Sequence, residues 1–248
     1  MNELIDKLKH KRYSTSFKSK KYPNDICLLE PSDETFEKIG DWVKVEKENM
    51  RPYKCTDQIN PFIKCKGRYD DIFSVSQKIL FVDFINTTQL SRNKRKLPLK
   101  KIAGHISNIN EIENRLKNGD KELPNEIVDI KDVDYNPFSF ATKFCRHANR
   151  DSYGEDDYVI YDSFVVKILP YYLPEEIEKT TFLDTHIRKK RNYKKLTELS
   201  EIFYKEYDIT VKNKNWLFDL FLWGQFNWSG KWKVETEKIK KKEKNINT

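Results

Sequence analysis

Apolar side chains recur at intervals of three and four residues along most of this chain, and no other feature limits its fold as narrowly. Such spacing places side chains on one face of an α-helix, which packs into a core. The clearest stripes are Phe36, Ile39 and Val43; Val75, Ile79 and Val82; Ile109, Ile112 and Leu116; and Leu196, Leu199, Ile202 and Phe203. A run that is apolar nearly all round, residues 216–223, ends at Gly224, which predicts a buried helix. We therefore expect an all-α fold.

The composition predicts a folded, soluble protein. Of 248 residues, 38% are hydrophobic and 13% aromatic, so a sizeable core can form although 35% are charged. No stretch of about 18 consecutive apolar residues occurs, and the first seven residues lack the apolar centre of a secretory signal. We expect a cytoplasmic protein without a membrane partner.

Prolines and charge runs suggest where the chain divides. Pro23, Pro31, Pro52 and Pro61 interrupt its beginning, so residues 1–35 and 48–71 should be irregular connections with a few short strands at most. The expected divisions are an N-terminal irregular and helical region that packs on the core (1–71), a helical domain (72–169), C-terminal helices that complete a second lobe (170–236), and a basic tail (237–248).

Two scarcities argue against cofactor chemistry. Only 7 glycines occur, and neither GxxxxGK[ST] nor GxGxxG is present, which disfavours a nucleotide-driven enzyme. The four cysteines, Cys27, Cys55, Cys65 and Cys145, lie far apart with no CxxC pair, which predicts reduced thiols and no zinc or iron–sulfur site. We expect no cofactor and no metal.

Positive charge is concentrated in four segments. The formal net charge is +8, but residues 9–21, 92–101 and 187–195 each hold six Lys or Arg and no acid, and residues 231–248 hold seven Lys against three Glu. If the fold brings even two of these runs together, they form a cationic track that can displace counterions from DNA. Double-stranded DNA is therefore the expected partner, although each run taken alone is also typical of a solvated loop.

The segment over residues 134–169 carries the chemistry. A helix that begins near Ser139 places Phe140 and Phe144 on one face, with Lys143 in the adjoining turn. Asp162 precedes a second apolar stretch as a helix-starting carboxylate. Lys143 and Asp162 could therefore face a common cleft.

This arrangement resembles the helix-hairpin-helix DNA glycosylase superfamily, in particular its 8-oxoguanine DNA glycosylase / AP lyase branch, in which a helix-borne lysine precedes a helix-starting aspartate by 19 residues. Five Lys/Asp pairs in this chain have that separation. Only Lys143/Asp162 combines the helix sequence Ala-Thr-Lys-Phe-Cys with a hydrophobic approach to an Asp-initiated apolar helix. The resemblance implies a two-lobed, mainly helical architecture over roughly residues 72–224.

The resemblance also implies a set of DNA contacts. The stretch Phe84–Asn93 is similar to a helix end whose Asn or Gln fills the gap left by an extruded nucleotide. The turn before residue 140 would bind phosphate, although it lacks the glycines that are usual there. The implied DNA-binding residues are Gln89, Asn86, Arg92, Asn136, Ser139 and His147, with Gln89 favoured over Asn86 for the gap. The implied base pocket consists of Phe140, Phe144, Trp223, Phe226 and Trp228.

The two central residues would divide the chemistry of base excision. Breaking an N-glycosidic bond leaves positive charge on the sugar, which Asp162 would stabilise. Lys143, freed of its proton by desolvation, would attack the sugar carbon, expel the base and form a Schiff base from which the strand is cleaved. The resemblance thus implies a DNA glycosylase with AP lyase activity, in base excision repair or in phage defence against modified DNA, acting as a monomer.

Other readings of the same residues remain open. A non-catalytic, basic helical DNA-binding protein would use the positive runs, with Lys143 contacting only phosphate. A metal-dependent nuclease would draw on the carboxylates of residues 151–157, although no paired-carboxylate spacing stands out there. Individually, Lys143 could be a surface lysine, Asp162 a helix cap, Gln89 a helix-end residue, His147 a structural histidine and the aromatic residues plain core.

Overall fold

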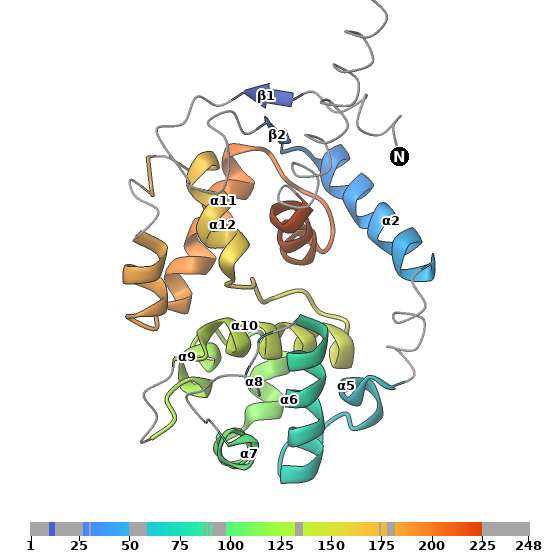
Figure 1. Ribbon diagram of the computed structural model, residues 1–248, viewed down its shortest axis with the longest axis vertical. Coiled ribbons are helices and arrows are strands. Elements are labelled where there is room, and N and C mark those ends of the chain that lie inside the picture. Colours follow the sequence, from blue (N-terminus) through green and yellow to red (C-terminus); the bar gives the residue numbers. More distant parts are fainter. Residues whose placement is uncertain are drawn as a thin grey trace, which may run out of the picture.

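The computed structural model describes residues 10–12, 27–29, 31–49, 59–86, 88, 90, 98–131, 136–173, 175–177 and 182–224. The protein is mainly helical (Figure 1), as the spacing of its apolar residues predicts. A single antiparallel pair of short strands accompanies the helices in this part of the chain, with His10 opposite Leu29 and Arg12 opposite Cys27.

The described residues form two strands, a set of α-helices and two π-helical turns. They are β1 (His10–Arg12), β2 (Cys27–Leu29), α2 (Asp33–Asn49), α5 (Pro61–Lys64), α6 (Ile72–Asn86), α7 (Leu99–Ser107), α8 (Ile112–Lys117), α9 (Leu123–Ile127), α10 (Phe138–His147), η1 (Ala148–Ser152), α11 (Ser163–Tyr172), η2 (Leu183–Arg188) and α12 (Tyr193–Glu206). Residues 214–224 form a further helix. The two η elements are π-helical turns, of which η1 directly continues α10.

The helices gather in two groups (Figure 1). Helices α5 to α10 form the lower group of the picture, where α6 packs on α7 and α10. The strands, α2, α11, α12 and the helix over 214–224 form the upper group. An extended segment leads from η1 to α11 between the groups, and its residues Tyr158, Val159, Ile160 and Tyr161 are all buried. Both groups therefore contact the segment that precedes Asp162.

Aromatic side chains fill the core of the upper group. The rings of Phe36 and Phe221 are stacked with centroids 5.0 Å apart, and those of Phe203 and Phe218 meet edge to face at 5.0 Å. All four are fully buried. The stripe on α2 and the near-continuous apolar run at 216–223 thus meet across the same core, as their patterns predict.

Two helices begin inside segments that we expected to be irregular. Helix α2 starts at Asp33, where Ser32 Oγ accepts a hydrogen bond from the Thr35 backbone N–H at 3.2 Å. Helix α5 starts at Pro61, and Oδ1 of its N-cap Asn60 accepts from the Phe62 N–H at 2.9 Å. Pro61 is the first residue of α5, where the fixed φ of proline suits the helix and its missing N–H costs nothing. Pro31 instead lies just before the Ser32 cap of α2.

Within the described residues, no helix combines the length and the apolar character needed to cross a bilayer.

Candidate functional site

Helix α10 carries Lys143 into the interior of the protein. Its side chain is 11% exposed, and the neighbouring Ala141, Thr142 and Phe144 are completely buried. An ammonium group that is largely removed from water requires a charged or polar partner. That partner is Asp162: Nζ of Lys143 lies 3.7 Å from Oδ2 of Asp162.

Asp162 is the N-cap of α11, as its sequence context predicts. One carboxylate oxygen, Oδ1, accepts hydrogen bonds from the backbone N–H groups of Phe164 at 2.8 Å and Val165 at 3.2 Å. These bonds fix the carboxylate and turn the other oxygen toward Lys143. The side chain is itself 11% exposed. The pair is thus partly desolvated, which strengthens its electrostatic interaction compared with that of a surface pair.

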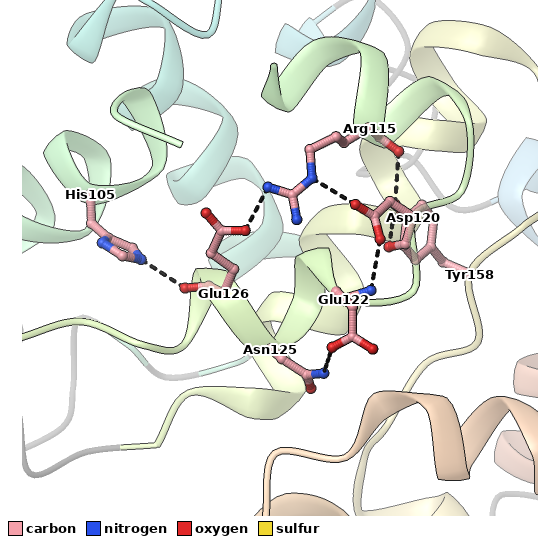
Figure 2. Close-up of polar contacts among 7 residues, drawn as sticks. All are labelled: His105, Arg115, Asp120, Glu122, Asn125, Glu126 and Tyr158. Atoms are coloured by element: carbon pink, nitrogen blue, oxygen red, sulfur yellow. Dashed lines mark hydrogen bonds and ion pairs between the residues drawn. The ribbon is translucent and has the colours of Figure 1, made fainter. Parts of the chain in front are cut away.

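The extended segment before Asp162 is held by hydrogen bonds at three successive points. The Tyr158 hydroxyl donates to the backbone oxygens of Arg115 and Asp120, at 3.2 and 3.1 Å (Figure 2). The hydroxyl of Tyr193 bonds both the N–H and the C=O of Val159, at 2.7 and 3.0 Å. The Tyr161 N–H donates to Oγ1 of Thr142 at 3.0 Å. Asp162 is therefore positioned by contacts to three separate parts of the fold.

A charged network stiffens the loop on which Tyr158 rests. Arg115 donates to Oδ2 of Asp120 at 2.6 Å and to Oε2 of Glu126 at 2.5 Å (Figure 2). His105 Nε2 lies 2.8 Å from the backbone oxygen of Glu126, which ties α7 to α9. The Glu122 N–H in turn donates to Asp120 at 2.9 Å. This network fixes the backbone oxygens that accept from Tyr158, and it lies away from the Lys143/Asp162 pair.

A second carboxylate, Asp219, interacts electrostatically with the Lys143/Asp162 pair, although the sequence analysis did not single it out. Burial and the negative charge of Asp162 raise the pKa of Asp219 to about 6, while Arg146 and Lys143 act in the opposite direction. The signal was present in the sequence, because Asp219 is the only charged residue in the apolar run 216–223. A charge retained in so apolar a helix indicates a specific environment.

The helix that carries Asp219 is anchored at its start by another aspartate. Asp156 accepts from the backbone N–H of Asn215 at 2.8 Å and of Trp216 at 3.0 Å. The guanidinium of Arg150 lies over the Trp216 ring, 4.0 Å from its centroid. One turn beyond Asp219 on the same helix face lies Trp223, which is partly exposed. Among the described residues predicted to form a base pocket, Trp223 thus shares a face with this carboxylate.

Two other predicted pocket residues lie in the core. Phe140 and Phe144 are 1% and 0% exposed. Their rings are 5.8 Å apart, and Phe144 also contacts Phe62 at 5.5 Å and Tyr69 at 6.4 Å. This packing gives both phenylalanines a core role, and contact with an extruded base would require the core to open.

His147 and Asn86 are joined to each other. Nδ2 of Asn86 lies 2.9 Å from Nε2 of His147 and 3.3 Å from the Val82 oxygen, so the amide donates both protons and Nε2 accepts. Nδ1 of His147 then donates to Oδ2 of Asp151 at 3.0 Å, and Asn60 donates to the same oxygen at 2.8 Å. Burial opposes charge on Asp151, but these hydrogen bonds outweigh it and lower the pKa of Asp151.

This arrangement bears on the predicted DNA contacts of both residues. The amide nitrogen of Asn86 points into the protein, and both ring nitrogens of His147 have partners inside it. Filling a gap in DNA would cost Asn86 these two bonds. The four other predicted residues Gln89, Arg92, Phe226 and Trp228 lie outside the described residues.

The turn before α10 is hydrogen-bonded to the basic segment 187–195. Asn136 Nδ2 donates to the backbone oxygen of Arg188 at 2.7 Å, which fixes the segment 187–195 beside the turn predicted to bind phosphate. Ser139 is partly exposed in the first turn of α10, whose N-cap makes no side-chain hydrogen bond. Lys189, Lys190 and Lys194 are exposed, and the described residues give them no ion pair. The start of α10 thus has no side-chain cap, and the exposed lysines lie within six residues of its contact at Arg188.

Within the described parts of the chain, no three His, Cys, Asp or Glu side chains are grouped so that they could hold a metal ion. Cys65 and Cys145 are free thiols.

Comparison with known proteins gives a partial match. Residues 37–152 match the family model HI_0787_N, described as an N-terminal domain, a range that contains Lys143 and stops before Asp162. The chain is similar to an uncharacterized protein of Haemophilus influenzae, with 33% identity over 124 residues that make up 49% of this chain and 54% of that protein. The chain thus spans about half the length of this curated relative. No solved structure matches it.

Proposed function

We propose that this protein is a bifunctional DNA glycosylase and AP lyase, in which Lys143 is the nucleophile and Asp162 stabilises the developing positive charge on the deoxyribose. The observation that carries this proposal is the partly buried pair itself, with Nζ of Lys143 3.7 Å from Oδ2 of Asp162. The two groups of helices in Figure 1 would then correspond to the two lobes of a helix-hairpin-helix glycosylase.

The proposed reaction uses only side chains of this chain. The neutral amine of Lys143 attacks C1′ of the sugar, and the bond to the base breaks with its electron pair leaving on the base, which takes up the proton that the attacking nitrogen releases. The covalent adduct becomes a Schiff base when the sugar ring opens. Loss of a proton from C2′ then expels the 3′ phosphate and cuts the strand. Asp162 acts in the first step, where its negative charge stabilises the positive charge of the oxocarbenium-like sugar.

DNA binding is proposed at the start of α10 and along residues 187–195. The exposed Lys189, Lys190 and Lys194 lie on the segment that Asn136 holds beside this helix end. Helix N-termini and lysine side chains both bind phosphate groups. If these cations neutralise phosphates, log Kd should rise linearly with log salt concentration, by about one unit per phosphate contacted.

The decisive experiment is borohydride trapping on a panel of duplexes that carry different damaged or modified bases. Reduction of the Schiff base gives a stable protein–DNA adduct only where an amine has attacked the sugar. Lys143→Gln should abolish the adduct and retain DNA binding, whereas Lys117→Gln, which removes an exposed lysine from the end of α8, should leave it unchanged.

The outcomes separate this proposal from a non-catalytic DNA-binding protein. Such a protein binds the same duplexes and gives no adduct with any of them. An adduct that persists in Lys143→Gln would also reject Lys143 as the nucleophile. The panel at the same time identifies the excised base, and so distinguishes a repair enzyme from one that acts on modified viral DNA.

A further inference from the structure

Large apolar side chains are exposed along one edge of the lower helix group. Among the described residues, the exposed large hydrophobics are Ile59, Ile63, Ile72, Phe73, Leu80 and Phe84, which are between 44% and 72% exposed. All six lie on or just before α5 and α6. We call them the α6 patch. Exposed apolar side chains scattered singly are ordinary, but six confined to two adjacent helices indicate a surface that another molecule covers.

The exposed face of α6 has the spacing of a helix-pairing seam. Phe73, Gln77, Leu80 and Phe84 are all exposed and follow one another at intervals of four, three and four residues. This is the spacing of the two inward positions of a coiled-coil heptad. None of the four is charged, although 35% of the chain is. The face therefore suits an apolar helix and carries no cation for a phosphate backbone.

Helix α5 lies next to the exposed face of α6. Sγ of Cys65, at the end of α5, lies 3.7 Å from Oε1 of Gln77 in the middle of the seam. Ile63, two residues earlier on α5, is half exposed. With the exposed fractions given, these six residues leave several hundred Å² in water, the same order as the roughly 800 Å² that each partner contributes to a stable interface.

We propose that this patch is the interface of a homodimer, in which α6 of one copy packs antiparallel on α6 of a second copy about a two-fold axis. A second copy fits because an isologous interface needs only a surface that complements itself, and an uncharged seam does so without repulsion. The antiparallel direction follows from charge: Asp70 and Asp71 are exposed at the start of α6, and a parallel pair would bring four carboxylates together.

The spacing fixes the register of this pair. When the centre of symmetry lies between Gln77 and Leu80, Phe73 opposes the partner's Phe84, and Gln77 opposes the partner's Leu80. Each contact then occurs twice, which places two phenylalanine pairs at the ends of the seam. The proposed dimer differs from the monomer expected from the sequence, and the proposal does not rest on the Lys143/Asp162 chemistry.

Sedimentation of the full chain over micromolar concentrations, under reducing conditions that exclude a Cys65 disulfide, tests the proposal. The wild type should sediment with twice the mass of one chain, and Leu80→Lys should raise the dimer dissociation constant roughly tenfold or more. The lysine is placed on an exposed helix face, so circular dichroism should show unchanged helix content. Phe73→Ser provides the same test where the charged variant fails to fold.

A double variant tests the register. Gln77→Glu combined with Leu80→Lys places each new carboxylate opposite the partner's new ammonium, so dimerisation should recover. The matched control is Ser76→Glu with Leu80→Lys, which forms a salt bridge within one helix but not between copies, and should stay monomeric. The proposal would be overturned by a monomeric wild type, by a dimer whose dissociation constant these substitutions do not change, or by equal rescue in the control. It would also be overturned if the patch contacts DNA or another segment of the same chain.

Discussion

Tyr161 and Thr142 are joined by a hydrogen bond from the Tyr161 backbone N–H to Oγ1 of Thr142, 3.0 Å long, and each residue directly precedes one member of the Lys143/Asp162 pair. The same hydroxyl donates to the Ser139 backbone oxygen at 3.1 Å, so its bonding capacity is used on both sides. This bond ties the end of the extended segment to α10, and it sets the distance between lysine and carboxylate.

Replacing this hydroxyl should therefore impair activity in a specific way. Thr142→Val keeps the shape of the side chain but leaves the buried Tyr161 N–H unsatisfied, which should cost about 1–3 kcal/mol of unfolding free energy. The freed segment should also let Asp162 move away from Lys143. Chemical denaturation and single-turnover base release measure the two effects, and Thr142→Ser, which retains the hydroxyl, is the control. Equal activity in the Val and Ser variants would contradict the positioning role of Thr142.

Asp162 combines a capping role with its proposed catalytic role, and two substitutions separate them. Asparagine caps helices about as well as aspartate but carries no charge, so Asp162→Asn should keep the helix cap, lose only the contribution of the ion pair with Lys143 to stability, and lower base release by roughly a hundredfold or more. Asp162→Ala should lose activity and also about 1 kcal/mol of stability. Thermal unfolding and single-turnover kinetics on the same protein samples make the comparison. Normal turnover in Asp162→Asn would leave only the capping role.

Sequence periodicity predicted the helices well, because it reports which faces are buried. The stripes on α2, α6 and α12 lie in the core, and Asp162 caps its helix as expected. Periodicity could not show that α6 is apolar on its exposed face too. Val75 and Phe73 are both apolar, and the sequence alone does not show which of them is buried. Partners across the fold were also invisible: nothing local to Asn86 or His147 indicates that residues 61 positions apart bind each other.

Lys78 makes the free energy of unfolding vary with pH in the alkaline range. The residue is completely buried, with Nζ 3.1 Å from the Arg68 oxygen and 3.8 Å from the Tyr69 ring centroid. Burial lowers the pKa of Lys78 to about 8 from 10.5. Between pH 8 and 10.5 the folded state thus binds fewer protons than the unfolded state, and this group's contribution to stability rises with pH.

The comparison with Lys78→Met isolates that contribution. Methionine fills the same space without a charge, so the variant should have a higher free energy of unfolding than the wild type below pH 8. The increase should be at most about 3 kcal/mol, and the loss of the polar contacts of Lys78 reduces it. The difference should shrink as pH rises to 10.5. Denaturant titrations at several pH values measure it, with Lys64→Met on α5 as an exposed control. A difference independent of pH would show that Lys78 stays charged in the folded state.

Asp219 should make both stability and base release depend on pH near 6. Its pKa is raised by burial and by Asp162, so between about pH 4 and 6 the folded state holds more protons than the unfolded state, and stability falls as pH rises through this window. Asp219→Asn should remove this fall.

On the proposed function, ionisation of Asp219 adds negative charge beside the sugar, so base release should rise through pH 6 in the wild type and lie flat and lower in Asp219→Asn. Asp208→Asn, an exposed carboxylate outside the site, should keep the wild-type profile in both measurements. A stability fall without the kinetic rise would make Asp219 a structural neighbour of the pair, because only a group that acts on the reaction moves the rate profile.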